Sequence, residues 1–266
     1  MSAEDILSRP QPPPDERLAY GADPNQFLEV RIPRAKGPHA VLLNIHGGYW
    51  RAKYDLAHAG QLCEALRMAG LATFNIEYRR VGNTGGGWPG TFEDIRAAYR
   101  FILQQPSRFN LDADRLVVMG HSAGAQLALC LAAHETAQET MIPSAISLAG
   151  VVDLKKGFTL HLSHDAVAEF LGGTPEAVPD HYREADPTEL PIPRARQWLI
   201  HGLADDTVPP EFSRDYVAAK KKAGEGVEIL EIPKASHFDL IDPASKAFEQ
   251  VKNVVLDSAA IRRVGG

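Results

Sequence analysis

A serine lies at the centre of the sequence Gly120-His121-Ser122-Ala123-Gly124, between an apolar run typical of a strand and an apolar pattern typical of a helix. A G-x-S-x-G sequence in this setting is typical of a nucleophile elbow, a tight turn that holds a serine hydroxyl above the edge of a sheet. The hydroxyl would face the start of a helix, where developing negative charge is favoured. The pattern therefore predicts that Ser122 is a nucleophile.

A serine hydroxyl attacks only when a base accepts its proton and a carboxylate orients that base. In the arrangement that uses this elbow, the acid and then the histidine follow the serine along the chain. Asp205 and His237 each follow an apolar run typical of a strand, in that order. We predict that His237 is the base and Asp205 the acid, with Asp206 and Asp153 as alternatives for the acid.

The sequence "NIHGGYW" follows another apolar run and could supply the remaining part of such a site. Attack on a carbonyl develops negative charge on its oxygen, which preorganised N–H donors stabilise. One donor would be the amide of Ala123, after the nucleophile, and the others the amides of Gly48 and Tyr49. We expect Gly47 to shape the turn and the His46 side chain to brace the loop by hydrogen bonds.

Large rings flank this loop and a second glycine-rich stretch, residues 82–90. The second stretch lacks the lysine and hydroxyl residue of a phosphate-binding loop, so we interpret it as a loop that carries Trp88 toward the pocket. We expect Trp50, Trp88 and His121 to line the substrate pocket. Rings at these positions favour short acyl groups or aromatic alcohols.

Short apolar runs alternate with amphipathic patterns along most of the chain. This alternation predicts a mostly parallel central sheet with helices on both faces. The predicted strands span residues 26–33, 40–45, 71–78, 115–120, 145–150, 196–202 and 227–233, and the clearest helices span 57–70, 91–105 and 123–135.

The chain reads as one domain with two additions. Four prolines between Ser8 and Glu16 indicate an extended N-terminal arm over residues 1–24, followed by the domain at 25–266. Residues 151–195 are longer than a simple crossover and rich in turn residues, so we interpret them as a small lid.

Composition excludes several classes of protein. The net charge of −6 gives no reason to expect nucleic acid or an anionic membrane as a partner. No stretch resembles a secretion signal or a membrane span, and Cys63 and Cys130 lie in apolar patterns rather than in a disulfide framework. We therefore expect a cytoplasmic protein with a small-molecule partner. His161 and His164 have no matching ligand pair, so no metal and no cofactor is predicted. The sequence does not indicate the oligomeric state.

Taken together, these motifs resemble the α/β-hydrolase superfamily, and within it the hormone-sensitive-lipase-like and bacterial esterase relatives. "HGGYW" is similar to the HGG-x-W signature of kynurenine formamidases (arylformamidases), and "EYRRVGNTGGGWPGTFEDI" followed by "GHSAG" is similar to small feruloyl and acetyl esterases. Many lipase-like relatives carry a third glycine where this chain has Tyr49.

The resemblance covers nearly all of residues 25–255. It implies the α/β-hydrolase fold and a cofactor-independent serine hydrolase, a carboxylesterase that cleaves small short-acyl or aryl esters through an acyl-enzyme. Two alternatives stay open. One is an arylformamidase acting on N-formylkynurenine-type amides, and the other is a ligand-binding relative without turnover.

Overall fold

A single sheet of eight strands forms the centre of the computed structural model, which describes residues 6–136 and 142–260. The strand order is β1-β2-β4-β3-β5-β6-β7-β8, with β1, β2 and β4 joined antiparallel and all other neighbours parallel. The strands are β1 (Glu16–Ala19), β2 (Phe27–Arg31), β3 (His39–Ile45), β4 (Ala72–Ile76), β5 (Leu111–His121), β6 (Ser144–Leu148), β7 (Arg196–Gly202) and β8 (Val227–Ile232).

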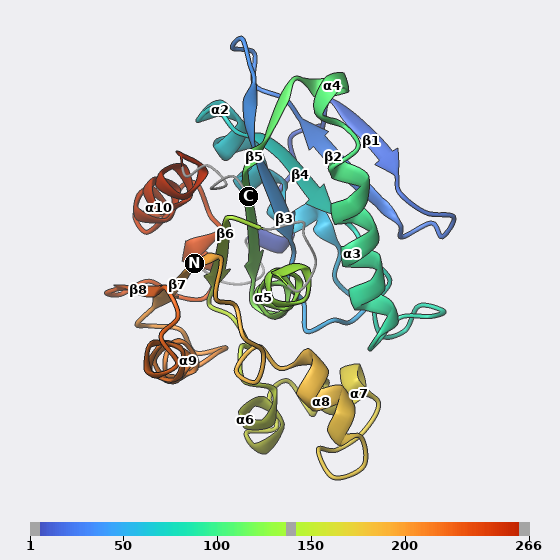
Figure 1. The fold of residues 1–266 in the computed structure, drawn as a ribbon, viewed down its shortest axis with the longest axis vertical. Helices are drawn as coiled ribbons and strands as arrows, with labels where there is room; N and C mark the ends of the chain where they lie inside the picture. Colours follow the sequence, from blue (N-terminus) through green and yellow to red (C-terminus); the bar gives the residue numbers. More distant parts are fainter. Residues whose placement is uncertain (1–5, 137–141, 261–266) are drawn as a thin grey trace.

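Helices cover both faces of the sheet (Figure 1). The apolar side chains of α3 (Gly90–Ile102), α5 (Ala123–Thr136) and α9 (Glu211–Lys222) belong to one buried cluster. Those of α2 (Gly60–Met68) and α10 (Phe248–Ala260) belong to the cluster on the opposite face. Three short elements complete these layers: η1 (Leu56–Ala59), α4 (Pro106–Phe109) and η2 (Phe238–Leu240). The predicted mostly parallel sheet with helices on both faces is confirmed.

All seven predicted strands are present, but β1 was not predicted. Its four residues alternate between half-buried and exposed positions at the edge of the sheet, so they carry no apolar run that a sequence pattern could detect. The predicted extended arm therefore contains a short edge strand that pairs with β2 through Glu16 opposite Val30.

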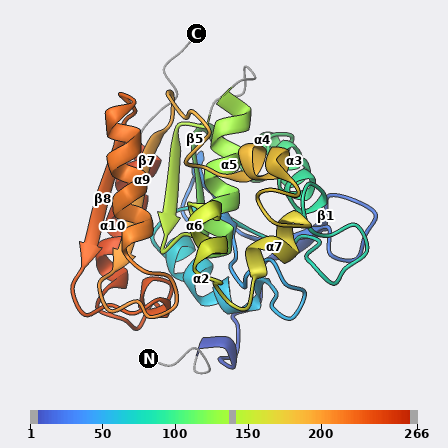
Figure 2. The same cartoon turned by 90° about the horizontal axis from the view of Figure 1, so that it is seen from below.

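The segment before β1 lies at the rim of the molecule near α2 (Figure 2) and contacts the domain at several points. Ile6 is fully buried, and Arg9 forms an ion pair of 2.6 Å with the buried carboxylate of Asp242. The amide of Gln61 on α2 donates to the Gln11 side chain. These contacts place residues 6–11 against the domain, close to the edge where the predicted site residues lie.

Residues 151–195 contain α6 (Leu154–Thr159), α7 (Ala166–Leu171) and α8 (Pro179–Ala185), which lie together at one end of the sheet (Figure 1). The buried carboxylate of Asp186 accepts hydrogen bonds from the amide of Leu154 and from Thr188. It therefore joins the start of α6 to the end of α8. Among the described helices, none combines the length and apolar character needed to cross a bilayer.

Candidate active site

Ser122 lies on the turn between β5 and α5 with a positive φ of 55°, a strained conformation for a residue with a side chain. A Cβ at Gly120 would lie 2.1 Å from the carbonyl oxygen of Gly124, and a Cβ at Gly124 would lie 2.2 Å from that of Ile45. Both glycines are therefore required by the close approach of strand, turn and helix. The turn has the geometry of a nucleophile elbow.

Asp205 and His237 follow the ends of β7 and β8 and meet at one point. The Nδ1 atom of His237 is 2.7 Å from Oδ2 of Asp205, and both side chains are almost fully buried. Neither alternative acid reaches this histidine in the recorded contacts: Asp153 accepts from the Lys156 amide at the start of α6, and Asp206 accepts from the Thr207 hydroxyl. The structure thus pairs His237 with Asp205.

The Asp205 carboxylate has several further donors. Its Oδ1 atom accepts the backbone amides of Thr207 and Val208 at 2.9 Å each, and Nε2 of His201 lies 3.3 Å from Oδ2. Burial by itself would raise the pKa of Asp205, but the hydrogen bonds from His201 and His237 outweigh burial and hold the pKa well below its usual range. The carboxylate is therefore ionised and fixed in orientation.

The oxyanion loop, which we define as residues 46–50, packs directly against the elbow. A Cβ at Gly47 would lie 2.8 Å from the carbonyl oxygen of His121 and 3.0 Å from Cβ of Ser122. Gly48 has a φ of 114°, which residues with side chains rarely adopt. Among the described residues, the amides of Gly48 and Tyr49 have no recorded acceptor. The loop therefore brings two free N–H groups close to Ser122.

Ala123 is the first residue of α5, so its amide has no acceptor within the helix. The helix start and the oxyanion loop are both next to Ser122, the loop at the end of β3 and the helix at the end of β5. The residues predicted as oxyanion donors are brought together by these two neighbouring parallel strands.

Ser122 and His237 line one cavity of about 190 Å³. The other lining residues come from the oxyanion loop, the segment after it, the elbow, the loops after β7 and β8, and the N-terminal segment. They are Leu7, Gly48, Tyr49, Tyr54, His58, His121, Thr207 and Phe238. The cavity is small for a ligand site, so it fits a small group.

Trp50 and Trp88 do not line this cavity, which corrects the prediction for both residues. Trp50 is fully buried, stacks on Phe170 of α7 at 4.5 Å and donates from Nε1 to Gln126 of α5. Trp88 stacks on Phe92, and its ring lies edge-on to Phe170. Sequence alone does not show that the positive φ of Trp50 turns its ring into the core.

The candidate lid also lies elsewhere than expected, because no residue of 151–195 lines the cavity. Arg51 instead joins the lid to the end of the oxyanion loop through Glu169, at 2.7 Å, and through Ser163 and His164. The large apolar and aromatic side chains that line the cavity include Leu7, Tyr54 and Phe238 instead.

His121 and His58 are neutral walls of the cavity. Burial, followed by the neighbouring imidazoles, lowers the pKa of His121 well below its usual value, and burial and His46 lower that of His58 to about 3. The Tyr49 hydroxyl donates to the carbonyl oxygen of Thr207, and burial and then Asp205 raise its pKa to about 12. These three groups therefore do not change charge near neutral pH.

Within residues 6–136 and 142–260, no three His, Cys, Asp or Glu side chains are grouped so that they could hold a metal ion. His161 instead contacts Asp165, and His181 contacts the carbonyl oxygen of Leu171.

A family model named BD-FAE matches residues 28–219, well over half of the chain. The chain belongs to the BD-FAE family. The matched region contains the oxyanion loop, Ser122 and Asp205, and His237 follows it.

Curated relatives of this chain include a protein named as an esterase and one named as a formamidase. The chain is 28% identical over 250 residues to esterase LipC of Mycobacterium tuberculosis, with 86% of this chain and 60% of LipC aligned. It is 24% identical to kynurenine formamidase of Danio rerio, with 85% of this chain and 75% of that protein aligned. The chain thus spans about three fifths of the length of LipC.

Solved structures settle the fold of this BD-FAE chain. Esterase B of Lactobacillus rhamnosis superposes with a TM-score of 0.81 at 17% identity, over 97% of this chain and 90% of that one. The BD-FAE chain has the α/β-hydrolase fold, as predicted.

Several residues that line the cavity were not predicted from the sequence. Tyr54 and His58 follow the oxyanion loop, and Thr207 and Phe238 stand next to predicted site residues, so proximity along the chain is a signal for them. Leu7 lies in a segment without any pattern, and only the folded chain shows it at the cavity.

Proposed function

We propose that this protein is a carboxylesterase that hydrolyses small short-acyl or aryl esters through an acyl-enzyme on Ser122. The observation that carries the proposal is the 2.7 Å contact between His237 and Asp205 in a site where His237 shares one small cavity with Ser122. The curated relative LipC, named an esterase, supports the same reaction class.

The reaction follows from the positions of these groups. The His237 Nδ1–H donates to Asp205, which leaves Nε2 to accept the Ser122 hydroxyl proton as the oxygen attacks the ester carbonyl. The amides of Gly48, Tyr49 and Ala123 stabilise the resulting oxyanion. His237 then protonates the leaving alcohol. In the second half of the reaction His237 accepts a proton from water, which attacks the acyl-enzyme, and the proton returns to the Ser122 oxygen as the acid is released.

The cavity restricts the substrate. A volume of about 190 Å³ holds a small acyl or alcohol group rather than a long lipid chain. Tyr49, Tyr54 and Phe238 give it aromatic walls, which favour a planar or short apolar group. Small uncharged esters are therefore the proposed substrate class.

A second candidate is the hydrolysis of an N-formyl aryl amide. The similarity to a protein named kynurenine formamidase favours it, and formyl is the smallest acyl group that such a cavity could accept. A cytoplasmic location belongs to the proposal as well, since the free thiols of Cys63 and Cys130 suit a reducing compartment.

The test compares the wild type with Ser122→Ala and with Ser107→Ala, an exposed serine on α4. We expect wild type and Ser107→Ala to cleave p-nitrophenyl acetate and to bind a fluorophosphonate covalently. Ser122→Ala should lose at least about 10⁴-fold in kcat and all labelling. Turnover of N-formylkynurenine above that of the ester would favour the formamidase, and an unlabelled wild type would contradict both.

A further inference from the structure

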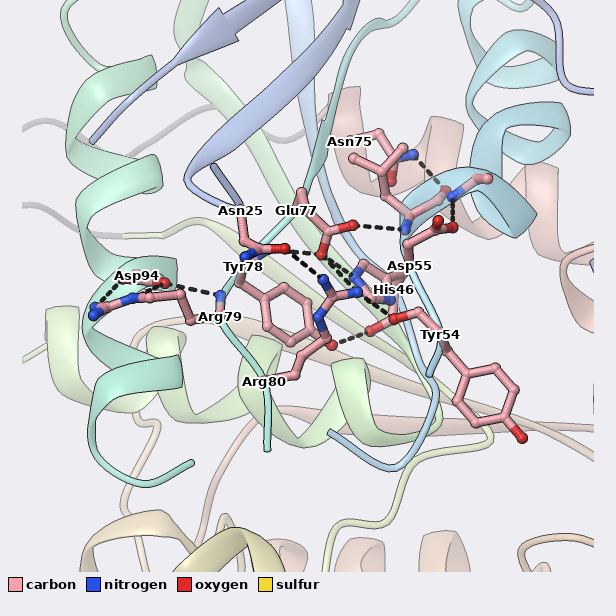
Figure 3. Close-up of polar contacts among 12 residues, drawn as sticks. Asn25, His46, Tyr54, Asp55, Asn75, Glu77, Tyr78, Arg79, Arg80 and Asp94 are labelled. Atoms are coloured by element: carbon pink, nitrogen blue, oxygen red, sulfur yellow. Dashed lines mark hydrogen bonds and ion pairs between the residues drawn. The ribbon is translucent and has the colours of Figure 1, made fainter. Parts of the chain in front are cut away.

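A second carboxylate–imidazole pair joins the first residue of the oxyanion loop to the residue after β4 (Figure 3). Nε2 of His46 is 3.1 Å from Oε1 of Glu77, and both side chains are almost inaccessible to solvent. The parallel register sets Ile45 of β3 opposite Ile76 of β4, so the next residue of each strand is brought to the same edge of the sheet. The reaction proposed above assigns this pair no role.

Donors surround the Glu77 carboxylate. The Tyr78 amide donates to Oε1 at 2.9 Å, Arg80 Nη1 lies 3.0 Å from Oε1, and the Leu56 amide donates to Oε2 at 3.1 Å. Burial alone would raise the pKa of Glu77, but the contacts with His46 and Arg80 lower it below its usual value. Glu77 is therefore an ionised carboxylate inside the protein.

His46 faces an acceptor at each ring nitrogen. Its Nδ1 atom is 2.7 Å from the carbonyl oxygen of Gly47, and its Nε2 atom faces the Glu77 carboxylate. A neutral imidazole has one N–H, so it satisfies only one of these acceptors, whereas an imidazolium donates to both. Only the charged form would therefore donate to both acceptors.

The other groups around His46 are compatible with this charge. The Tyr78 ring stacks on the imidazole at 4.5 Å, where its π-face attracts a cation. His58 lies edge-on at 5.6 Å and is neutral, since burial lowers its pKa to about 3. Arg80 Nη1 contacts the same Oε1 atom of Glu77 as His46 Nε2 does, so its positive charge opposes a charge on His46, while the carboxylate lies against both groups.

The hydrogen bond from His46 affects the cavity through the peptide group between Gly47 and Gly48. The bond between Gly47 and Gly48 is trans, since the cis peptides of the described chain lie elsewhere, so its C=O and N–H point in opposite directions. The His46 Nδ1–H holds the Gly47 oxygen, which fixes the direction of the Gly48 N–H. A charge-assisted hydrogen bond to that oxygen also polarises the peptide and strengthens its N–H as a donor.

We infer that Glu77 is a positioning residue: it holds His46 as an imidazolium, and His46 aims and polarises the Gly48 amide at the oxyanion. This inference rests on the proposed function for its effect on turnover. Glu77 does not line the cavity, so its effect on the Gly48 amide passes through His46.

Asp94 supplies a matched control. It is a buried carboxylate on α3 that pairs with Arg79 at 2.6 Å, in the same view, and its contacts run to Arg79 and Gln26 rather than to the oxyanion loop (Figure 3). Glu77→Gln and Asp94→Asn therefore each neutralise one buried acid beside an arginine. Only Glu77→Gln changes the partner of His46.

The kinetic experiment measures kcat and KM for p-nitrophenyl acetate and the inhibition constant of a trifluoromethyl ketone, which forms a tetrahedral adduct. For Glu77→Gln we expect kcat to fall about 10- to 100-fold, less than on outright loss of an oxyanion donor, with KM within about threefold. The inhibition constant should rise in step with the loss of kcat/KM. Asp94→Asn should stay within about threefold in kcat. An equal loss of kcat in the two variants would overturn the inference.

A second readout does not need turnover. In ¹⁵N-labelled protein at pH 8, His46 should show protons on both ring nitrogens, and Glu77→Gln should leave one, while Asp94→Asn should keep both. A single ring proton on His46 in the wild type would overturn the inference. If the wild type neither hydrolyses esters nor labels at Ser122, the proposed function fails separately, and the ring protons still decide the state of the pair.

Discussion

Two carboxylate–imidazole pairs stand at the same edge of the sheet, and they are built differently. His237 meets Asp205 at 2.7 Å through Nδ1 and lines the cavity, and its other ring nitrogen has no hydrogen-bond partner among the described residues. His46 meets Glu77 at 3.1 Å and uses both ring nitrogens within the protein. A histidine that exchanges protons keeps one nitrogen available, whereas a histidine that only orients a backbone group has none to spare.

Among the variants that test this difference, Asp205→Asn is expected to lose the most activity. The amide would donate to Nδ1 of His237 and place the ring proton on Nε2, so the base could no longer accept from Ser122. We expect kcat for p-nitrophenyl acetate to fall about 10⁴-fold, far more than for Glu77→Gln. Asp206→Asn, one exposed residue further on, should stay within about threefold. Equal losses at Asp205 and Glu77 would mean that the two pairs do not differ in role.

Gly48→Ala tests the peptide on which His46 acts. A Cβ there would lie 2.5 Å from Cβ of Tyr54, at a φ of 114°. The displaced amide should cost about 10²- to 10³-fold in kcat. Gly70→Ala is the matched control, since Gly70 has a φ of 107° with open space around its Cβ position. Both variants should lose stability in thermal melts. An equal loss of kcat in the two variants would show that the loss at Gly48 reflects instability rather than a displaced amide.

The stability of the protein tests the state of His58, the neutral imidazole whose ring lies edge-on to His46. The pKa of His58 is about 3 in the folded protein and near 6.5 when exposed, so the unfolded chain binds more protons between these values. The stability that His58 contributes is full above pH 6.5 and is lost as the pH falls toward 3, by up to about 1.4 kcal/mol per pH unit.

Thermal or denaturant unfolding of wild type and His58→Asn between pH 4 and 7 checks this effect. The free energy of unfolding of His58→Asn should depend less steeply on pH. Identical pH dependences of the two proteins would contradict the neutral, buried state of His58.

The smallest effect is expected for Tyr78→Phe. The Tyr78 hydroxyl donates to the His46 carbonyl oxygen at 2.8 Å, while its ring stacks on the imidazole. Phenylalanine keeps the ring and loses one hydrogen bond, which is worth about 1 kcal/mol. We expect a loss of stability of that size in denaturant unfolding and a change in kcat of threefold or less. A loss of kcat as large as that of Glu77→Gln would show that the hydroxyl, rather than the carboxylate, positions His46.

The parts of this molecule that sequence predicts are those with a repeating or local signal. Each parallel strand is an apolar run, and the elbow is a contiguous pentapeptide, so their positions follow from the pattern alone. Because parallel strands end at one edge, Asp205 and His237 could be expected near Ser122. The structure places Asp205 and His237 in contact, as the order along the chain suggested.

The features that the sequence does not predict depend on the direction of a side chain or on which strands pair. The Trp50 ring is buried in the core, and neither that direction nor the residue's positive φ of 57° is evident from the sequence. Glu77 looks like the polar end of a strand until the register of β3 with β4 sets it beside His46. The order of strands, which brings β3 between β4 and β5, is the missing information in that case.

The contacts of Trp50 limit the construction of chimeras between related proteins. Its indole connects the oxyanion loop to Gln126 of α5 and to Phe170 of α7, and Arg51 adds an ion pair to Glu169 of the same helix. The segment 151–195 is therefore not an independent module that can be swapped to alter substrate range. A transplanted segment has to bring an aromatic ring and an acidic side chain to the same two places, or the donors beside Ser122 lose their support.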